Sequence, residues 1–433
     1  PSIPKVHQVL RSLFIDINHT VERVSGHFFT LLSDQTLAGS ICRKFCSEVL
    51  NNENYGKQGL GLIEWNIKSD KESKVVSKPY SITSIGVISE AFNNYFKNKS
   101  NSGTLTDMLG LDSHDLEDLY EMGSGTDRQS KSTFPWKEFN FEQKAILEDK
   151  CESTIAKQLV RLFFNELPYK RLYEHYSHVL QTEIISKADA KTGNSDNYIS
   201  VRKRIFSFQP ILRDESDYQN IYKDFIKKVA ASYKDASPHG YVIITKTVFQ
   251  KGVLLAWFEL CKRLLRKLSL EDTTTMLICL VDQATSSDKE VFSNTDEHLF
   301  LQNTIFNGIN IDPSVESSKQ ISRLILAQLG SKNIINLIIP KLKAAGNKML
   351  LNNEFTKIGV SSSGTFVNVL FKKKIAFIKK HYSADYSIHS TVRDEIRDAE
   401  ENYLKGVEGV SDEDSEAIFN KLLWNNIKDD YYL

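Results

Sequence analysis

The sequence predicts a mainly α-helical protein, built as a multi-helix bundle or irregular helical array, with at most a small β element. Three observations predict this class. The second half of the chain consists of segments with a polar start residue, an apolar stripe at helical spacing and a stop residue. No repeat with a fixed period of roughly 20–50 residues accompanies them. Such helices bury their stripes only by packing on one another.

Start and stop residues define the clearest helices. Ser at a helix start accepts a hydrogen bond from the backbone N–H groups of the first turn, and the helix dipole favours acidic residues there. Gly often ends a helix because it tolerates the left-handed conformation. By these signals helices start at Ser269, Ser331, Ser390 and Ser411, and the second and third of them stop at Gly346 and Gly406.

The first half of the chain is less regular. Residues 1–55 predict two helices, because their apolar residues follow helical spacing. After Gly56 come short apolar runs in which a β period fits as well as a helical one, so a small β-hairpin is an alternative there. Residues 97–133 are rich in Ser, Gly, Asn and Asp and predict a long loop or linker, with a short helix at 105–121 as an alternative within it.

From residue 141 the helical pattern is stronger. One long helix is predicted from Glu142 to Asn165, and Pro168 either ends it or starts the next one, which runs to about Lys187. A second loop is predicted at 188–199. Further helices are predicted near 216–234, 246–268, 270–284, 295–307, 315–329, 332–345, 366–382, 390–405 and 412–427.

One segment favours a strand by composition. Tyr241–Val248 is rich in β-branched residues and is able to begin a β-α-β unit that ends with Met276–Val281. No further strands follow that would complete such a sheet, so the helical interpretation is kept. The predicted organisation is an N-terminal helical subdomain (1–100), a loop-rich junction (101–133) and a C-terminal multi-helix region (134–433).

Charge and cysteine content restrict the classes of function that fit this chain. The chain has 433 residues with 55 Lys and Arg against 55 Asp and Glu, and this zero net charge removes the usual argument for general affinity to nucleic acids or membranes. The 5 cysteines are an odd number in apolar runs and predict a reducing, cytoplasmic location, with the nucleus as the alternative. No apolar run approaches the roughly 20 residues that cross a bilayer, and no signal peptide is visible. A start at Pro rather than Met predicts a trimmed sequence.

Cysteine and histidine pairs do not amount to metal sites. Cys42 and Cys46 stand four residues apart in an apolar helical run, but structural zinc needs two more Cys or His ligands, so buried structural cysteines are predicted. His175 and His178 share a helix face and hold a metal only with a third ligand, which the sequence does not supply. No metal and no cofactor are therefore predicted.

The glycine and serine motifs likewise lack the context of an active site. Gly56, Gly59 and Gly61 follow no strand and precede no Lys-Ser or Lys-Thr, which argues against a phosphate-binding loop. The segment Gly359–Gly364 has one residue too many between its glycines for a nucleophile elbow, so it predicts a loop that caps the next helix. No catalytic residues are predicted.

Clusters of Lys and Arg are the one local signal above background. Two helical segments carry them beside an apolar stripe, and a third run is Arg202–Arg204. Cationic faces are most often only solvated. As binding surfaces they fit, in this order, an acidic protein partner, the headgroups of an anionic membrane as a weak contact, or a phosphate backbone. The candidate partner-binding residues are Lys372, Lys373, Lys374, Lys379, Lys380, Lys262, Arg263, Arg266 and Lys267.

These observations predict a non-enzymatic helical adaptor, tether or cargo-binding scaffold. We expect it to act as a subunit of a larger intracellular assembly, for instance in intracellular transport, through protein–protein contacts. Many helices, balanced charge, segregated acidic and basic stretches and the lack of a catalytic constellation favour this class. An enzyme with dispersed catalytic residues is the first alternative, and a nucleic-acid- or chromatin-associated helical protein is the second. Aromatic residues do not alternate with the cations, which argues against sequence-specific RNA reading.

Overall fold

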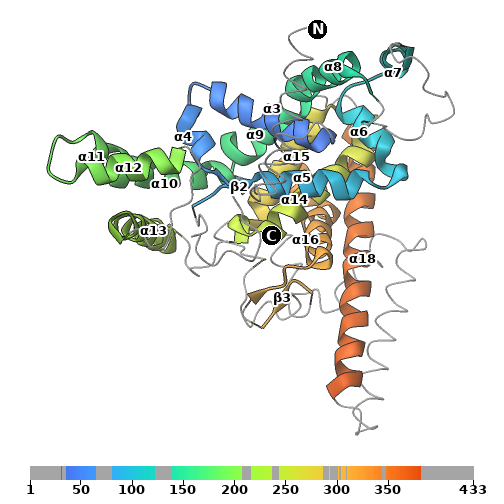
Figure 1. Cartoon of the computed structure of the whole chain (residues 1–433). Coiled ribbons are helices and arrows are strands. Elements are labelled where there is room, and N and C mark those ends of the chain that lie inside the picture. Colours follow the sequence, from blue (N-terminus) through green and yellow to red (C-terminus); the bar gives the residue numbers. More distant parts are fainter. Residues whose placement is uncertain are drawn as a thin grey trace. The chain divides into compact units, whose positions relative to one another are not determined.

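The described part of the chain is mainly α-helical, as the sequence predicts (Figure 1). Within it the only sheets are two two-stranded pairs, β1–β2 and β3–β4, so the predicted class of a helical array with a small β element is confirmed. The computed structural model describes residues 36–64, 80–121, 139–206, 216–236, 243–285, 304–308, 310–343 and 348–381, together with Leu31, Trp136, Phe292 and Leu301.

The chain forms two compact units. Unit 1 comprises residues 1–240 and 261–270, and unit 2 comprises residues 241–260 and 271–433. Helix α14 (Thr247–Leu264) therefore supplies residues to both units. The junction predicted at 101–133 lies inside unit 1. The two compact units meet in the sequence at residues 240/241, 260/261 and 270/271.

From residue 36 onward, the described part of unit 1 starts with two helices and a short parallel sheet. Helix α3 (Leu37–Asn51) starts at Thr36, whose Oγ1 accepts a hydrogen bond from the backbone N of Gly39 at 3.3 Å. The next elements are α4 (Gly56–Gly61), β1 (Ile63–Glu64), β2 (Thr83–Ser84) and α5 (Ile85–Phe96). Because β1 and β2 run parallel, they need a long connection, and the β element is not the hairpin considered after Gly56.

The stretch predicted as a long loop contains helices in its first part. These are η1 (Lys99–Asn101), α6 (Ser102–Met108) and α7 (Ser113–Glu121). The side chain of Asp112 accepts hydrogen bonds from the backbone N–H groups of His114 and Asp115, both at 2.8 Å, and so starts α7. The helix considered at 105–121 is therefore two helices, separated by a turn at Gly110 with a φ of 66°.

The long helix predicted from Glu142 to Asn165 is present as one continuous run. Asn140 and Gln143 form a capping box at its start. Two π-helical turns interrupt its α-helical hydrogen bonding. In order, the run consists of α8 (Phe141–Cys151), η3 (Glu152–Ala156), α9 (Lys157–Val160) and η4 (Arg161–Asn165).

Pro168 starts the following helix, which is one of its two predicted roles. This second run consists of α10 (Tyr169–Leu180), η5 (Gln181–Ile185) and α11 (Ser186–Asp189). Helices α12 (Ser195–Phe206) and α13 (Ser216–Ala236) complete this part of unit 1. The loop predicted at 188–199 is shorter, because α12 begins inside it.

The core of unit 1 is aromatic where α3 packs against the helix Phe141–Asn165. Phe45 of α3 meets Phe163 and Phe164 at ring-centroid distances of 6.4 and 6.1 Å, and Phe163 meets Tyr169 at 5.0 Å. All four side chains are 0% exposed. Such ring pairs contribute roughly 0.5–1.5 kcal/mol each beyond their burial, so this cluster fixes how the two helical runs pack.

Unit 2 opens with helices where the sequence also allowed a strand. The 3₁₀ turn η6 (Ile243–Thr245) precedes α14, and Met276–Val281 lies within α15 (Leu270–Thr285), so the helical interpretation of both segments is correct. A β-hairpin of β3 (Phe306–Asn307) and β4 (Asn310–Ile311) follows. The helix predicted at 295–307 is therefore wrong at its end, because Phe306 and Asn307 are in a strand.

Up to residue 381, the described remainder of unit 2 contains three helices with 3₁₀ turns between them. They are α16 (Val315–Ala327), η8 (Gln328–Gly330), α17 (Lys332–Ile338), η9 (Ile339–Lys341) and α18 (Lys348–His381). The Oγ of Ser331 accepts a hydrogen bond from the backbone N of Ile334 at 3.5 Å, which confirms Ser331 as the predicted N-cap. The first helix of residues 1–55, the stops at Gly346 and Gly406, and the helices at 390–405 and 412–427 lie outside the described residues.

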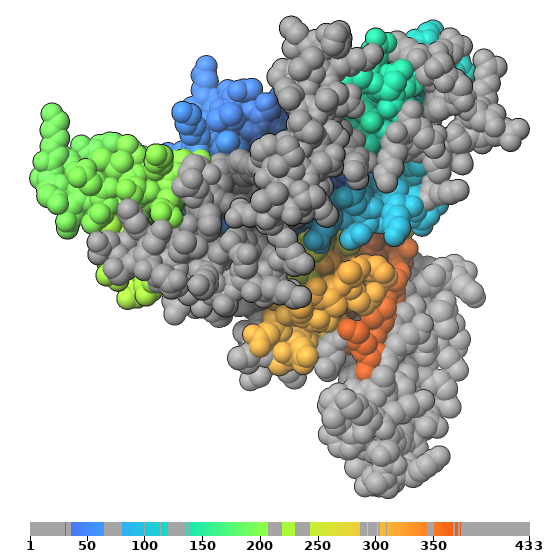
Figure 2. All heavy atoms as spheres, in the orientation of Figure 1, coloured from blue at the N-terminus to red at the C-terminus, as the bar shows by residue number. Residues whose placement is uncertain are grey.

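Helix α18 begins at Lys348 instead of residue 366, and it lies beside α16 (Figures 1 and 2). The segment Gly359–Gly364, predicted as a loop, is therefore inside a helix. Its first glycine touches the backbone at η8, since a Cβ on Gly359 would lie 1.9 Å from Gly330 N and 2.4 Å from the carbonyl carbon of Leu329. The glycine at this position allows two helical segments to cross with their backbones in contact.

Candidate functional site

Four of the predicted cations lie together at the end of α14 and on the turn after it, and all four are exposed. We call them the turn cluster: Lys262, Arg263, Arg266 and Lys267. Between them, Cys261, Leu264 and Leu268 are 1%, 0% and 3% exposed. The backbone N of Leu268 donates to the carbonyl oxygen of Leu264 at 2.8 Å, which fixes the turn. The helical spacing of the sequence thus sends the apolar side chains inward and the cations outward.

One member of the turn cluster is anchored to a neighbouring element of unit 1. The Nζ of Lys262 donates a hydrogen bond to Oδ1 of Asn101 at 2.9 Å. Asn101 is itself buried, and its Nδ2 donates to the carbonyl oxygen of Tyr95 at 3.0 Å. Lys262 therefore belongs to a polar connection between the turn and η1, which holds the cluster in place.

Asp107 of α6 lies within electrostatic range of Arg266. Burial raises the pKa of the Asp107 carboxyl, and the positive charge of Arg266 partly opposes that rise. The turn cluster places four positive charges on this face of unit 1, with Asp107 as an acidic neighbour of Arg266. A group of like charges is the property that a partner of opposite charge recognises.

The lysines predicted on the last helix are placed differently. Lys373 is half-buried and acts electrostatically on Asp312, just before α16. Burial raises the pKa of Asp312, but hydrogen bonds from Ser314 and Ser317 and the charge of Lys373 outweigh it and lower that pKa. The side chains of the other predicted members, Lys372, Lys374, Lys379 and Lys380, lie outside the described residues. The turn cluster is in unit 1 and these lysines are in unit 2, so they do not form one surface of a single unit.

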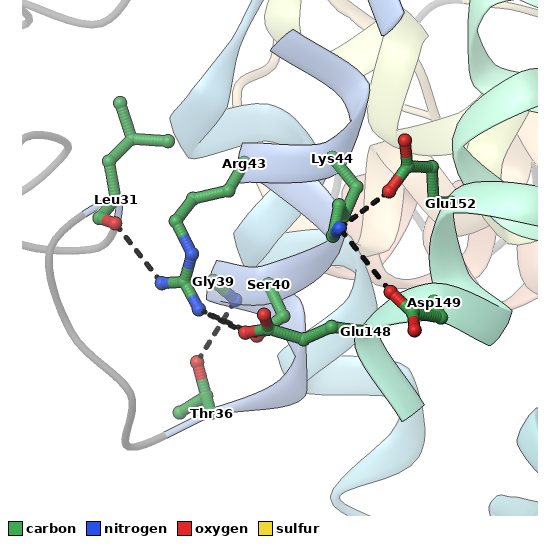
Figure 3. Close-up of polar contacts among 9 residues, drawn as sticks. All are labelled: Leu31, Thr36, Gly39, Ser40, Arg43, Lys44, Glu148, Asp149 and Glu152. Carbon is green, nitrogen blue, oxygen red and sulfur yellow. Dashed lines mark hydrogen bonds and ion pairs between the residues drawn. The ribbon is translucent and has the colours of Figure 1, made fainter. Parts of the chain in front are cut away.

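Sequence reasoning did not identify a second charged cluster, which joins α3 to the helix Phe141–Asn165 (Figure 3). The Oε1 of Glu148 accepts hydrogen bonds from the guanidinium of Arg43 at 2.7 Å and from the hydroxyl of Ser40 at 2.8 Å. One turn along, the Nζ of Lys44 is paired with Glu152 at 2.5 Å and with Asp149 at 3.8 Å. Only a weak signal for this cluster is present in the sequence. Arg43 and Lys44 are adjacent cations on one helix, and the other helix carries acidic residues at 148, 149 and 152.

Both cations of this second cluster are paired with carboxylates of the protein itself. Burial raises the pKa of the Glu148 carboxyl, but the hydrogen bond and charge of Arg43 and the hydrogen bond from Ser40 outweigh it, so that pKa lies below its usual value of 4.5. Arg43 also donates to the carbonyl oxygen of Leu31 at 3.1 Å. Because Arg43 and Lys44 are both paired across the two helices, the cluster stabilises the packing of α3 against the helix Phe141–Asn165.

The cysteine and histidine pairs behave as structural residues. Cys42 is fully buried, with its Sγ 3.8 Å from the carbonyl oxygen of Ile85, and Cys46 is half-buried. A ring nitrogen of His175 lies 3.3 Å from the carbonyl oxygen of Val229, and His178 is exposed. Across the part of the chain that the structure describes, no group of three or more His, Cys, Asp or Glu residues is placed to hold a metal ion.

The first glycine motif is helical and not a phosphate-binding loop. Gly56, Gly59 and Gly61 lie on α4, and two of them are in close contact with other elements. A Cβ on Gly59 would lie 3.1 Å from Cγ1 of Val49 on α3, and one on Gly61 would lie 3.0 Å from the ring of Phe206 on α12. Both glycines therefore serve packing in unit 1.

Comparisons with protein-family models, with curated proteins and with solved structures found no match for this chain. Among the helices that the structure describes, none combines the length and the apolar character needed to span a membrane. The turn cluster is therefore the candidate functional surface on the strength of its own geometry.

Proposed function

We propose that this protein is a non-enzymatic helical scaffold or adaptor that binds an acidic protein partner through the turn cluster. One observation carries the proposal: four exposed cations lie together at the end of α14 and on the turn after it, in unit 1. Buried Leu264 and Leu268 anchor the turn, so little conformational entropy is lost when a partner binds.

The anchoring favours a protein interface over a surface that is merely solvated. A solvated lysine needs no fixed position, whereas Lys262 is held by Asn101. Arg263 and Arg266 provide planar guanidinium groups, which bind carboxylates with two parallel hydrogen bonds. An acidic loop or helix of another protein has the matching chemistry.

The proposal is tested by reversing charge at the turn cluster. The double variant Arg263→Glu/Lys267→Glu changes the net charge by four, and the control Lys170→Glu/Arg171→Glu makes the same change on exposed cations of α10. Both variants are compared with the wild type by quantitative affinity purification from cells, with circular dichroism as the test of folding. We expect an acidic protein to be lost with the first variant and kept with the control, and its complex to weaken as salt rises.

Other outcomes would contradict the proposal in defined ways. Equal recovery of every partner by both variants would show that the turn cluster is only solvated. Binding of the wild type to DNA with a steep salt dependence, lost in the same variant, would favour the nucleic-acid alternative. Binding to anionic vesicles and to no protein would favour a membrane surface.

A further inference from the structure

The side chain of Asn101 is turned away from the capping role that its position offers. Asn101 is the residue before α6, where Asn commonly accepts a hydrogen bond from the first backbone N–H groups of a helix, but its side chain makes no such bond. Its Nδ2 donates instead to the carbonyl oxygen of Tyr95 at 3.0 Å, in the last turn of α5. This bond fixes the amide, because only the NH₂ group donates, and Oδ1 is left to face Lys262.

The anchor of Lys262 is a neutral group. Its Nζ donates to Oδ1 of Asn101 at 2.9 Å, and Asn101 is only 8% exposed. By contrast, the Nζ of Lys44 in the second charged cluster is paired with Glu152 at 2.5 Å and with Asp149 at 3.8 Å. A carboxylate balances the charge of the lysine that it holds. An amide fixes the position of the ammonium group but does not cancel its charge.

We propose that a carboxylate of the acidic partner binds at Lys262, and that Asn101 is the positioning residue that holds Lys262 for it. An ammonium group has three N–H donors and Asn101 accepts from one of them, so donors remain for the partner. Lys262 is exposed, and because its side chain is already held, less rotamer freedom is lost on binding. This inference rests on the function proposed above, since it names the contact within the turn cluster.

The test measures binding of a fluorescein-labelled oligoglutamate peptide to the full chain by fluorescence anisotropy. Asn101→Asp keeps the size of the side chain but gives Lys262 a carboxylate partner that competes with the peptide. We expect the Kd of the peptide to rise about two- to fivefold, the effect of one exposed ion pair. The matched control is Asn54→Asp, which adds the same charge in the exposed turn between α3 and α4 and should change the Kd less.

A second variant tests Lys262 directly. An Asp at position 101 lacks the donor to Tyr95, so circular dichroism checks the fold of that variant. Lys262→Gln changes only an exposed side chain and should also raise the Kd about two- to fivefold. In the Lys262→Gln background, Asn101→Asp should have no further effect, because Asn101 acts through Lys262. An unchanged Kd in Lys262→Gln would overturn the inference, and so would a full additional loss in the double variant.

The same assay separates the failure of this inference from the failure of the proposed function. If Arg263→Glu/Lys267→Glu loses the peptide while Lys262→Gln binds it as the wild type does, the turn cluster binds acidic partners but not through Lys262. If the wild type does not bind the peptide, or if Arg263→Glu/Lys267→Glu binds it equally well, both proposals are wrong.

Discussion

The α-carbon of Gly359 has no room for a methyl group, because a Cβ there would lie 1.9 Å from Gly330 N. The neighbouring atoms belong to backbone and cannot rotate away. Gly359→Ala should therefore lower the free energy of unfolding by about 3 kcal/mol, the upper end for overpacking. Chemical denaturation monitored by circular dichroism measures this change.

Gly103 is the matched control for that substitution. It also lies in a helix, but a Cβ there would meet nothing within 4 Å. Gly103→Ala should leave stability unchanged or raise it by up to about 1 kcal/mol, because Ala is the better helix former. If both variants were equally stable, the close crossing of α18 over η8 would be wrong.

The Arg43–Glu148 pair makes stability depend on pH. The folded-state pKa of Glu148 lies below its usual value of 4.5, so the carboxylate stabilises the fold above that value, and this contribution is lost as pH falls through the lower folded-state pKa. Glu148→Gln should therefore be less stable than the wild type at pH 7 and should lose less stability on acidification. Thermal melts from pH 7 to pH 3 test this.

The control for the pH series is the exposed Glu142, one turn and a half before Glu148 on α8. Glu142→Gln removes a carboxylate from the same helix without touching Arg43. Its melts should follow those of the wild type across the pH range. Parallel curves for Glu148→Gln and the wild type would contradict the role given to the ion pair.

At the scale of elements, the start of α8 depends on its N-cap residue, Asn140. The Oδ1 of Asn140 accepts a hydrogen bond from the backbone N of Gln143 at 3.0 Å, and the Oε1 of Gln143 accepts one from the backbone N of Asn140 at 2.7 Å. Asn140→Ala should lower the free energy of unfolding by about 1 kcal/mol. Asn54→Ala, at an exposed turn position, is the control and should change it by less than about 0.5 kcal/mol.

Most helices could be predicted because their signals are local. Ser331 caps α17, and apolar spacing from Glu142 to Asn165 and the break at Pro168 matched the structure. The start of α18 was missed because Gly and Ser in Gly359–Gly364 have loop composition. Gly359 is required because the backbone of Gly330 lies against it. A contact between residues this far apart leaves no pattern in the local sequence.

The candidate site was predictable in part: its exposed position followed from the sequence, but its neighbours did not. Helical spacing placed the turn cluster on the solvent side, since Leu264 and Leu268 mark the buried side. Its neighbours could not be predicted, because Asn101 and Asp107 are distant in the sequence.

At the scale of the whole molecule, charge balance controls solution behaviour. The formal net charge is zero and the isoelectric point is about 7.4. With no net repulsion between copies, self-association should be strongest near pH 7.4 and should weaken toward pH 5.5 or pH 9. Light scattering across this range tests it. Scattering that rises steadily with pH and shows no maximum would contradict the prediction.

The route of α14 through both units has a consequence for synthesis of the protein on the ribosome. Unit 1 uses residues 1–240 and then residues 261–270, so its first part emerges before its last part is made. At roughly 5–20 residues per second, the missing 30 residues take about 1.5–6 s to add. During that interval unit 1 lacks Leu264 and Leu268, and the nascent chain is expected to depend on chaperones until translation has passed residue 270.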